Sequence, residues 1–584
     1  MRSPKDWQQH VDQLKTRAKD VVRTCLPVTQ LSLLRSRVLQ PSKLPKRKCV
    51  RSPQTRTATY EQAEDVYLKT LVLLTPLLTK PMAKPIEAWR QFHEKATAWI
   101  IERRDRLEDE GYERVLDYSE FPMMDSLLPV EPLWLVEAKP AMKLLCAVPF
   151  RDKTITELDV SGQSIGVEGA LVIHRYLENN EALTSLNISS NKIGLMVPPA
   201  GWRSKDGDGV APWVHDDGRT LESGVPEGSK PEGAIAIANA ICTNMALAKL
   251  IMRKNGLLTK EAGKALGNML AAKTALKEFD ISDNYGSTAG SVEDIPGFTK
   301  EFAVGLSANG PMTSLNISAN KLRSPSAKAL AGALRDNSVL KQLNVAENQL
   351  SCHEKDGKGL DMSGIVEFTD AIKNNGVLTS LNISSNNLGE LVFVEDGWSE
   401  TGDEYKGTKE YNHTDGRKQK NKPPQEPKGA MALSNAVKNN GALENLHIGN
   451  NNIPVENMND IIAQIEAAPA MKVLCAVPFR DKTITELDVS GQSLGVEGAV
   501  VIGRYLENNR ALVKLDISNN EIRVAGAKAL AAALNHNNVL SELNVALNAM
   551  TNPGDGSTDM SGVIAIRDVI PTMRALESLN GLNA

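Results

Sequence analysis

The sequence predicts an α/β solenoid, a stack of strand–helix units, and three observations predict it. A pattern of apolar residues, Leu or Phe, and then Asn or Gln recurs eleven times between Ile155 and Met550. Its spacing is a basic unit of 28 residues plus insertions. Stretches with apolar residues at helical spacing follow the pattern, as in residues 327–334. Such self-similarity indicates stacked units, because each unit buries its apolar face only against its neighbours.

Each unit is expected to begin with a short strand. In residues 183–193 apolar and polar residues alternate, so one set of side chains points inward and the other toward solvent. Asn191 follows the strand where the backbone must bend, and its amide can satisfy main-chain groups left unpaired at the turn. We predict the same structural role for a ladder of amides at this position of the repeat: Gln163, Asn191, Asn255, Asn284, Asn320, Asn348, Asn386, Asn451, Gln492, Asn520 and Asn548.

A family resemblance is carried by residues 512–522, Leu-Val-Lys-Leu-Asp-Ile-Ser-Asn-Asn-Glu-Ile, and by residues 526–534, Gly-Ala-Lys-Ala-Leu-Ala-Ala-Ala-Leu. The sequence resembles the ribonuclease-inhibitor-like class of leucine-rich repeat proteins over about residues 140–584. The resemblance implies a right-handed α/β horseshoe, a leucine-rich repeat solenoid of about 11–12 repeats of 28 residues. It also implies a role in binding other proteins, because the class shares an architecture rather than a reaction.

The distribution of charge and of cysteines limits the possible functions further. The formal net charge is −4, but residues 1–60 hold fourteen Lys or Arg against three Asp, about +11, which leaves about −15 for the rest. A basic arm therefore precedes an acidic body. The six cysteines lie far apart without a Cys-x-x-Cys pair. This indicates free thiols in a reducing compartment rather than a disulfide framework or a zinc site.

The chain is predicted to have three parts. Residues 1–58, rich in Pro, Ser and basic residues, are expected to be a flexible arm. Residues 59–139 are expected to be a mainly helical region that caps the solenoid of residues 140–584, with Trp89 and Trp99 on one helical stripe. We expect a cytoplasmic protein without membrane insertion, since no apolar run is long enough. Nuclear or organellar import through the basic N-terminus is the alternative.

Two block duplications suggest that the array grew by copying. Residues 140–188 recur at 469–517 with eight differences in 49 positions. Residues 327–350 also resemble residues 527–550. A history of copying fits modular surfaces better than a unique catalytic site.

Two units carry long inserts between the Asn turn and the helix, at residues 195–230 and 390–427. Both contain Gly-Trp and a later His-x-Asp-Gly-Arg run, in which Asp-Gly is a hairpin signal. The second insert resembles a degenerate WW module, with Lys420 where that family has its ligand-facing tryptophan, so proline binding is not expected. Aromatic residues in the inserts are the expected anchors for a partner: Trp202, Trp213, Trp398, Tyr405 and Tyr411.

The concave face is expected to be small, polar and mildly acidic. Its carboxylates could hold an extended basic partner through many weak contacts. The candidate residues are Asp159, Asp280, Asp488 and Asp516.

No motif for catalysis, metal binding or cofactor binding is complete. Asp206 and Asp208 hint at a calcium loop, but Val210 fills a ligand position. The sequence therefore predicts a non-enzymatic scaffold or adaptor that binds protein partners, with no cofactor. Two alternatives stay open: a regulator of a small GTPase resembling the Ran GTPase activator, and binding of nucleic acid or another anionic surface through the basic arm.

Overall fold

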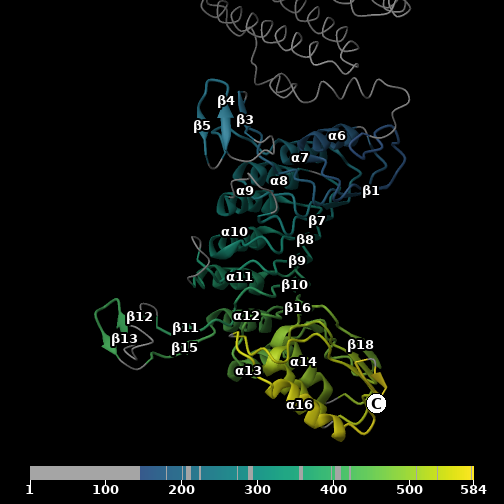
Figure 1. Ribbon diagram of the computed structural model, residues 1–584, viewed down its shortest axis with the longest axis vertical. Helices are drawn as coiled ribbons and strands as arrows, with labels where there is room; N and C mark the ends of the chain where they lie inside the picture. The colour runs from purple at the N-terminus through teal and green to yellow at the C-terminus, as the bar shows by residue number, and fades with distance from the viewer. Residues whose placement is uncertain are drawn as a thin grey trace, which may run out of the picture. The chain divides into compact units, whose positions relative to one another are not determined.

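The computed structural model describes residues 145–584, apart from short gaps at residues 179, 200, 206–211, 223–224, 273, 287–293, 354–359, 396–397, 402–409, 420–421, 508, 536, 555, 581 and 584. The flexible arm of residues 1–58 and the helical cap of residues 59–139, which the sequence predicts, lie outside the described residues. In the described part, short strands follow one another along one side and helices along the other (Figure 1). This arrangement confirms the predicted α/β leucine-rich repeat solenoid.

A parallel sheet of nine strands forms the larger part of the solenoid. The central residues of neighbouring strands are in register, so that Leu186 lies between Leu158 and Leu250. Leu186 is fully buried, as the alternating pattern requires. In order, the strands are β1 (Glu157–Asp159), β2 (Ser185–Asn187), β6 (Lys249–Ile251), β7 (Glu278–Asp280), β8 (Ser314–Asn316), β9 (Gln342–Asn344), β10 (Ser380–Asn382), β16 (Asn445–His447) and β17 (Val473–Leu474).

Helices pack against the face of each sheet that carries the buried leucines, opposite the concave face, and bury their apolar stripes there. Helices α8 and α9 approach each other closely, because a Cβ on Gly305 would lie 1.9 Å from the carbonyl oxygen of Gly267. Glycine is therefore needed at Gly305 so that the two backbones can touch. The described helices are α6 (Gly166–Glu178), α7 (Glu232–Thr243), α8 (Lys260–Ala271), α9 (Ile295–Ala308), α10 (Arg323–Asp336), α11 (Ser363–Asn374), α12 (Lys428–Lys438), α13 (Val455–Glu466), α14 (Gly495–Glu507), α15 (Arg523–Leu534) and α16 (Ser561–Val569).

The sheet ends at β17, and a second sheet begins after it. From the sequence, the long gap between Leu446 and Leu487 belongs to one regular series of repeats, but the structure places a break there. After β17 the chain turns back in a tight hairpin, in which Cys475 and Ala476 both take left-handed conformations and Leu474 pairs with Val477. The second sheet contains β18 (Glu486–Asp488), β19 (Lys514–Asp516), β20 (Glu542–Asn544), β21 (Ser578–Leu579) and the antiparallel β22 (Leu582–Asn583).

Side chains hold the two sheets together at this break. The Oε1 atom of Glu497 accepts hydrogen bonds from the backbone N–H groups of Asn451, at 3.1 Å, and Ile453, at 3.0 Å. Glu497 is only 1% exposed, and burial raises the pKa of its carboxyl group above the ordinary value. Arg504 adds an ion pair to Glu466 at 2.9 Å. Glu497 on α14 thus accepts the two backbone hydrogen bonds that an asparagine side chain accepts elsewhere in the solenoid.

A second contact at the break comes from His447. Its Nδ1 atom lies 3.2 Å from the backbone nitrogen of Gly449, and its Nε2 atom lies 2.7 Å from the carbonyl oxygen of Gln492. Because Nδ1 accepts a hydrogen bond from an N–H group, Nε2 carries the proton and donates to the carbonyl. Burial lowers the pKa of His447, which favours this neutral form.

The ladder of asparagines runs through the turns that follow the strands. In a typical rung, the Nδ2 atom of Asn348 donates to the carbonyl oxygens of Ile317, at 2.9 Å, and Val345, at 3.1 Å, while its Oδ1 atom accepts from the backbone N–H of Asn320 at 2.8 Å. Each rung therefore ties its own turn to the preceding repeat. The buried rungs are Asn191, Asn255, Asn284, Asn320, Asn348, Asn386, Asn451, Asn520 and Asn548.

The two glutamines at the same sequence position do not take part in the ladder. The side chains of Gln163 and Gln492 are both exposed, and among the described residues the Nε2 atom of Gln163 donates only to the carbonyl oxygen of Ser161 in its own turn, at 3.4 Å. At the break, Glu497 supplies the acceptor that a rung at Gln492 would have offered to the preceding repeat. No preceding repeat is described for Gln163.

Both inserts fold into small antiparallel sheets. The first contains β3 (Trp202–Ser204), β4 (Trp213–His215) and β5 (Thr220–Leu221). The second contains β12 (Trp398–Thr401), β13 (Glu410–His413) and β14 (Lys418–Gln419), on a stem of β11 (Val392–Phe393) and β15 (Gln425–Glu426). In Figure 1 both inserts lie on the side of the helices, away from the strands of the parallel sheet.

Candidate protein-binding surfaces

The same four-residue cluster holds each insert together. In the first insert, Trp202 pairs across the strands with His215, and their ring centroids lie 5.1 Å apart. The His215 ring contacts Asp217 at 2.8 Å, Asp217 contacts the Arg219 guanidinium at 2.8 Å, and that guanidinium lies over the Trp202 ring at 5.6 Å. The cluster closes on itself, so it fixes the hairpin turn against the tryptophan.

The second insert repeats this cluster. Trp398 pairs with His413 at a centroid distance of 5.1 Å, Asp415 bridges His413 and Arg417, and the Arg417 guanidinium lies over the Trp398 ring at 5.4 Å. Glu395 is an addition here, since it accepts a hydrogen bond from the Trp398 indole at 3.2 Å and also contacts Arg417. The sequence shows the His-x-Asp-Gly-Arg run in both inserts, but the closure onto tryptophan becomes visible only in the structure.

The carboxylates of these clusters are held in the charged form. A hydrogen bond from the Arg417 backbone, with contributions from the Arg417 and His413 side chains, lowers the pKa of Asp415 to about 2. The corresponding bond from Arg219 lowers the pKa of Asp217 to about 2. Hydrogen bonds from Arg417 and Trp398 lower the pKa of Glu395 as well.

Acid should therefore loosen the inserts. Because the folded-state pKa of Asp415 lies below its ordinary value of 3.8, its contribution is complete above that value and is lost as the pH falls toward about 2. We expect Asp415→Asn to speed amide hydrogen exchange at Arg417 and Lys418 at neutral pH, with exchange in α10 unchanged. Equal exchange rates in the wild type and the variant would contradict this role for the carboxylate.

The structure separates the aromatic anchor candidates into two groups. Trp213 and Tyr411 are 2% and 4% exposed, and Tyr411 packs edge-on against Phe393 at 6.0 Å. They occupy equivalent positions in the two inserts and form the cores of the small sheets, so they are not exposed anchors. Trp202 and Trp398 are half-buried, with one ring face lying under an arginine. Tyr405 lies outside the described residues.

The concave face is built from rows of three side chains, one row from each repeat. In the row of β8, Asn316 stands in the middle position and its Oδ1 atom accepts a hydrogen bond from the backbone N–H of Ser318 at 3.2 Å. The rows are those of the eleven described three-residue strands in the two parallel sheets, which excludes the two-residue strands β17 and β21. In ten of these eleven rows the middle residue makes the same bond, to the residue two positions later. The middle residues that make this bond are Asp159, Asn187, Asp280, Asn316, Asn344, Asn382, His447, Asp488, Asp516 and Asn544.

The four candidate carboxylates of this face therefore also support the turns. Asp280 accepts from Ser282 through one oxygen and from Asn316 through the other, at 3.1 Å. Hydrogen bonds from Ser161 lower the pKa of Asp159, which remains exposed. Burial opposes ionisation of Asp516, but hydrogen bonds outweigh it and the pKa is lowered. Asp159 and Asp488 are the more accessible members of the set, because both are exposed.

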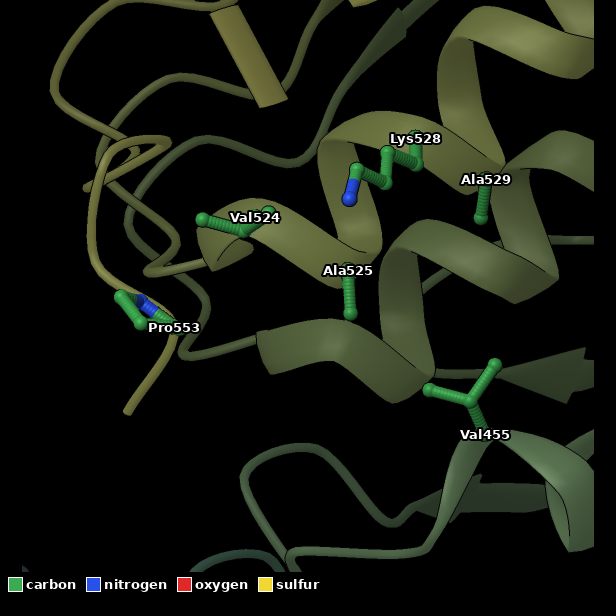
Figure 2. Close-up of a pocket in the computed structure, with 6 residues that line it drawn as sticks. All are labelled: Val455, Val524, Ala525, Lys528, Ala529 and Pro553. Carbon is green, nitrogen blue, oxygen red and sulfur yellow. The ribbon is translucent and has the colours of Figure 1, made fainter. Parts of the chain in front are cut away.

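A groove of about 450 Å³ lies where the helix layer opens near the break in the sheet. Figure 2 shows Val524, Ala525, Lys528 and Ala529 on α15, facing Val455 at the start of α13 and Pro553 on a loop. Apart from the Lys528 amine, these side chains carry no group for acid–base or nucleophilic chemistry. In the described part of the chain, no group of three or more His, Cys, Asp or Glu side chains could hold a metal ion. None of the described helices combines the length and apolar character needed to span a membrane.

A family model and a solved structure are similar to this chain. A family model described as leucine-rich repeat matches residues 179–195, around β2, and residues 508–531, around β19 and α15. Among solved structures, an internalin from Listeria monocytogenes matches at 14% sequence identity, with 75% of this chain and 90% of that chain covered and a TM-score of 0.29. No curated protein matches the sequence. The repeat pattern, the stacked strands and the two matched segments identify the fold as a leucine-rich repeat solenoid.

Proposed function

We propose that this protein is a non-enzymatic scaffold or adaptor that holds protein partners on two surfaces, the inserts and the concave face. The observation that carries the proposal is the repeated cluster of Trp, His, Asp and Arg, which organises both inserts although most of their other residues differ. A module that is built twice on one solenoid supports recognition, because repeat proteins present binding elements at regular places on a rigid support.

The two surfaces would make different contributions. Trp202 and Trp398 offer half-buried aromatic edges beside charged groups, a combination common at the centre of protein interfaces. The carboxylates of Asp159 and Asp488 would add charge complementarity on the concave face, which affects association rate and specificity more than affinity. Trp213 and Tyr411 would act indirectly, by keeping the inserts folded.

The cysteines support a location in a reducing compartment such as the cytoplasm. Cys146, Cys242, Cys352 and Cys475 are all free thiols. Burial raises the pKa of Cys475 to about 12, so its thiol is unreactive at neutral pH. Thiols that stay reduced in this way are typical of intracellular proteins.

Quantitative co-purification from a lysate of the source cells tests the proposal. The full chain is compared with variants that lack residues 196–229, residues 391–426, or both, and circular dichroism checks that each solenoid is folded. The double alanine variant of Trp202 and Trp398 is a milder comparison. We expect a partner of the full chain to be lost from the double deletion.

Each outcome has a definite meaning. If the same partners persist in the double deletion, the inserts are not the recognition site. Stimulated GTP hydrolysis by a captured GTPase would favour the regulator alternative. Capture of nucleic acid that disappears steeply with added salt would favour the basic arm.

A further inference from the structure

One row of the concave face departs from the pattern of all the others. In β6 the middle position holds Ile251, whose side chain cannot accept a hydrogen bond, whereas the other ten described three-residue strands of the two parallel sheets have Asp, Asn or His there. The backbone N–H of Arg253 consequently turns to the neighbouring repeat and donates to the Oγ atom of Ser189 at 3.3 Å. The β6 repeat therefore lacks the turn bond between the middle side chain and the backbone N–H two residues later. A departure of this kind in an otherwise regular array indicates a functional position.

The last position of the same row is also exceptional. Across the concave face this position holds small residues, and Arg253 is the exception among the described rows. Its neighbours on either side are Ser189 and Ser282, which leave the guanidinium open to the face. The small residues are Ser161, Ser189, Ser282, Ser318, Ala346, Ser384, Gly449, Ser490, Ser518 and Ala546.

Arg253 carries the uncompensated charge of this region. Lys249, in the first position of the row, pairs with Glu278 at 3.1 Å, and Lys254, in the turn, pairs with Asp283 at 3.2 Å. Arg253 itself is exposed, and it forms no ion pair with any described residue. Of the three cations in the strand row and its turn, Lys249 and Lys254 are therefore paired, and Arg253 is open to another molecule on the concave face.

We infer that the β6 row is the anchor point for an extended acidic segment of a partner protein, with Arg253 receiving a carboxylate and Ile251 receiving an aliphatic side chain. This inference deepens the proposed function and rests on it. The planar guanidinium can bind a carboxylate through two parallel hydrogen bonds. A carboxylate is favoured because Ser189 and Ser282, at the same position of the neighbouring rows, are uncharged. Asp280, which is in register with Ile251, already accepts hydrogen bonds from Ser282 and Asn316.

The spacing of the row sets the sequence of the partner. Residues two apart on a strand lie roughly 6.6 Å apart, which is also the spacing of side chains two apart in an extended peptide. A segment lying along β6 would therefore place an acidic residue on Arg253 and an aliphatic residue two positions away on Ile251. The contact is distinct from the inserts, which lie on the side of the helices (Figure 1).

Synthetic peptides test the assignment with defined probes. One set carries Asp or Glu two positions from Leu, Ile or Val. Matched sets replace the acidic residue with Lys or the aliphatic residue with Ser. Binding of the full chain is measured by fluorescence anisotropy at low and high salt. We expect only the first set to bind well, and added salt should weaken it because the contact lies at the surface.

Two variants and one control locate the contact. Arg253→Glu should weaken binding of the acidic peptides at least about tenfold. Ile251→Asn recreates the turn acceptor of the other rows, so it should leave the melting temperature unchanged or raised while it also weakens binding. Arg510→Glu makes the same charge change at an exposed site on another surface and should have no effect on binding.

The outcomes separate this inference from the proposed function. If no acidic peptide binds better than its Lys counterpart, or if binding survives Arg253→Glu, the assignment to the β6 row is wrong. Loss of a cellular partner on deletion of the inserts would in that case still support the scaffold. If the peptides bind as expected but deletion of the inserts changes no partner, the β6 row is supported as a binding site. The proposed role of the inserts in partner binding is then wrong.

Discussion

Replacing Asn348 with alanine should lower the free energy of unfolding by about 4 kcal/mol. The side chain is fully buried and makes four hydrogen bonds, to the carbonyl oxygens of Ile317 and Val345 and from the N–H groups of Asn320 and Leu322. Alanine leaves these groups buried and unpaired, and each such group costs about 1–3 kcal/mol before the turn relaxes. Urea unfolding followed by circular dichroism measures the loss.

Amide hydrogen exchange adds a local readout, since solenoids do not always unfold in one step. We expect exchange to accelerate first at Asn320 and Leu322, whose N–H groups lose their acceptor. Gln492→Ala is the matched control, because Gln492 stands at the same position of its repeat but is exposed. That change should alter stability by less than about 0.5 kcal/mol. Similar losses in the two variants would show that the ladder does not depend on its side-chain bonds.

Replacing Glu497 with alanine should cost about 3 kcal/mol and should act on the break between the two sheets. The N–H groups of Asn451 and Ile453 both depend on its Oε1 atom, and alanine would leave them buried without an acceptor. Glu497→Gln keeps a carbonyl oxygen at this position and removes a buried charge, so it should be neutral or stabilising. Urea unfolding of the three proteins at neutral pH makes the comparison.

The pH dependence of this pair of variants follows from the sign of the pKa shift. Burial raises the folded-state pKa of Glu497 above its ordinary value of 4.5. The group therefore supports the fold below that value, and this support is lost as the pH rises through the folded-state pKa. The stability advantage of Glu497→Gln over the wild type should grow from pH 4 to pH 8. An advantage that stays constant with pH would contradict a buried, titrating carboxyl group.

The internal duplication supplies a control for Glu497 within the same chain. Glu168 is its counterpart in the first copy of the block, at the same point of a helix with nearly the same sequence. It is exposed, whereas Glu497 is buried. Glu168→Ala should therefore change the stability of the solenoid by less than about 0.5 kcal/mol.

The repeat pattern alone was sufficient to predict the fold, because every strand and every asparagine rung recurs at a fixed place in the unit. The pattern could not reveal the break after β17. In the sequence, the gap between Leu446 and Leu487 reads as one more insertion in the repeat series. The replacement of a rung by Glu497 depends on a contact between residues 46 positions apart. A long-range contact of this kind leaves no periodic signal in one sequence.

The candidate surfaces were harder to predict for a related reason. The sequence identifies the aromatic residues of the inserts, but burial of Trp213 and Tyr411 depends on which face of each small sheet packs inward. The four candidate carboxylates of the concave face also look free in the sequence, although in the structure each of them accepts a turn bond. Arg253 stands out only after every row is compared with its neighbours.

The break after β17 also affects how the solenoid would respond to a pulling force. Within each sheet, neighbouring repeats are joined by backbone hydrogen bonds and by the amide ladder. The two sheets are instead joined by the side chains of Glu497, His447 and Arg504, which connect the β16 and α13 repeat to the β18 and α14 repeat. Tension applied along the solenoid would therefore concentrate at this joint and leave the two stiff arms intact. A partner that bound on both sides of the break would stiffen it. A partner that bound on one side only would leave the break as the weakest point of the solenoid.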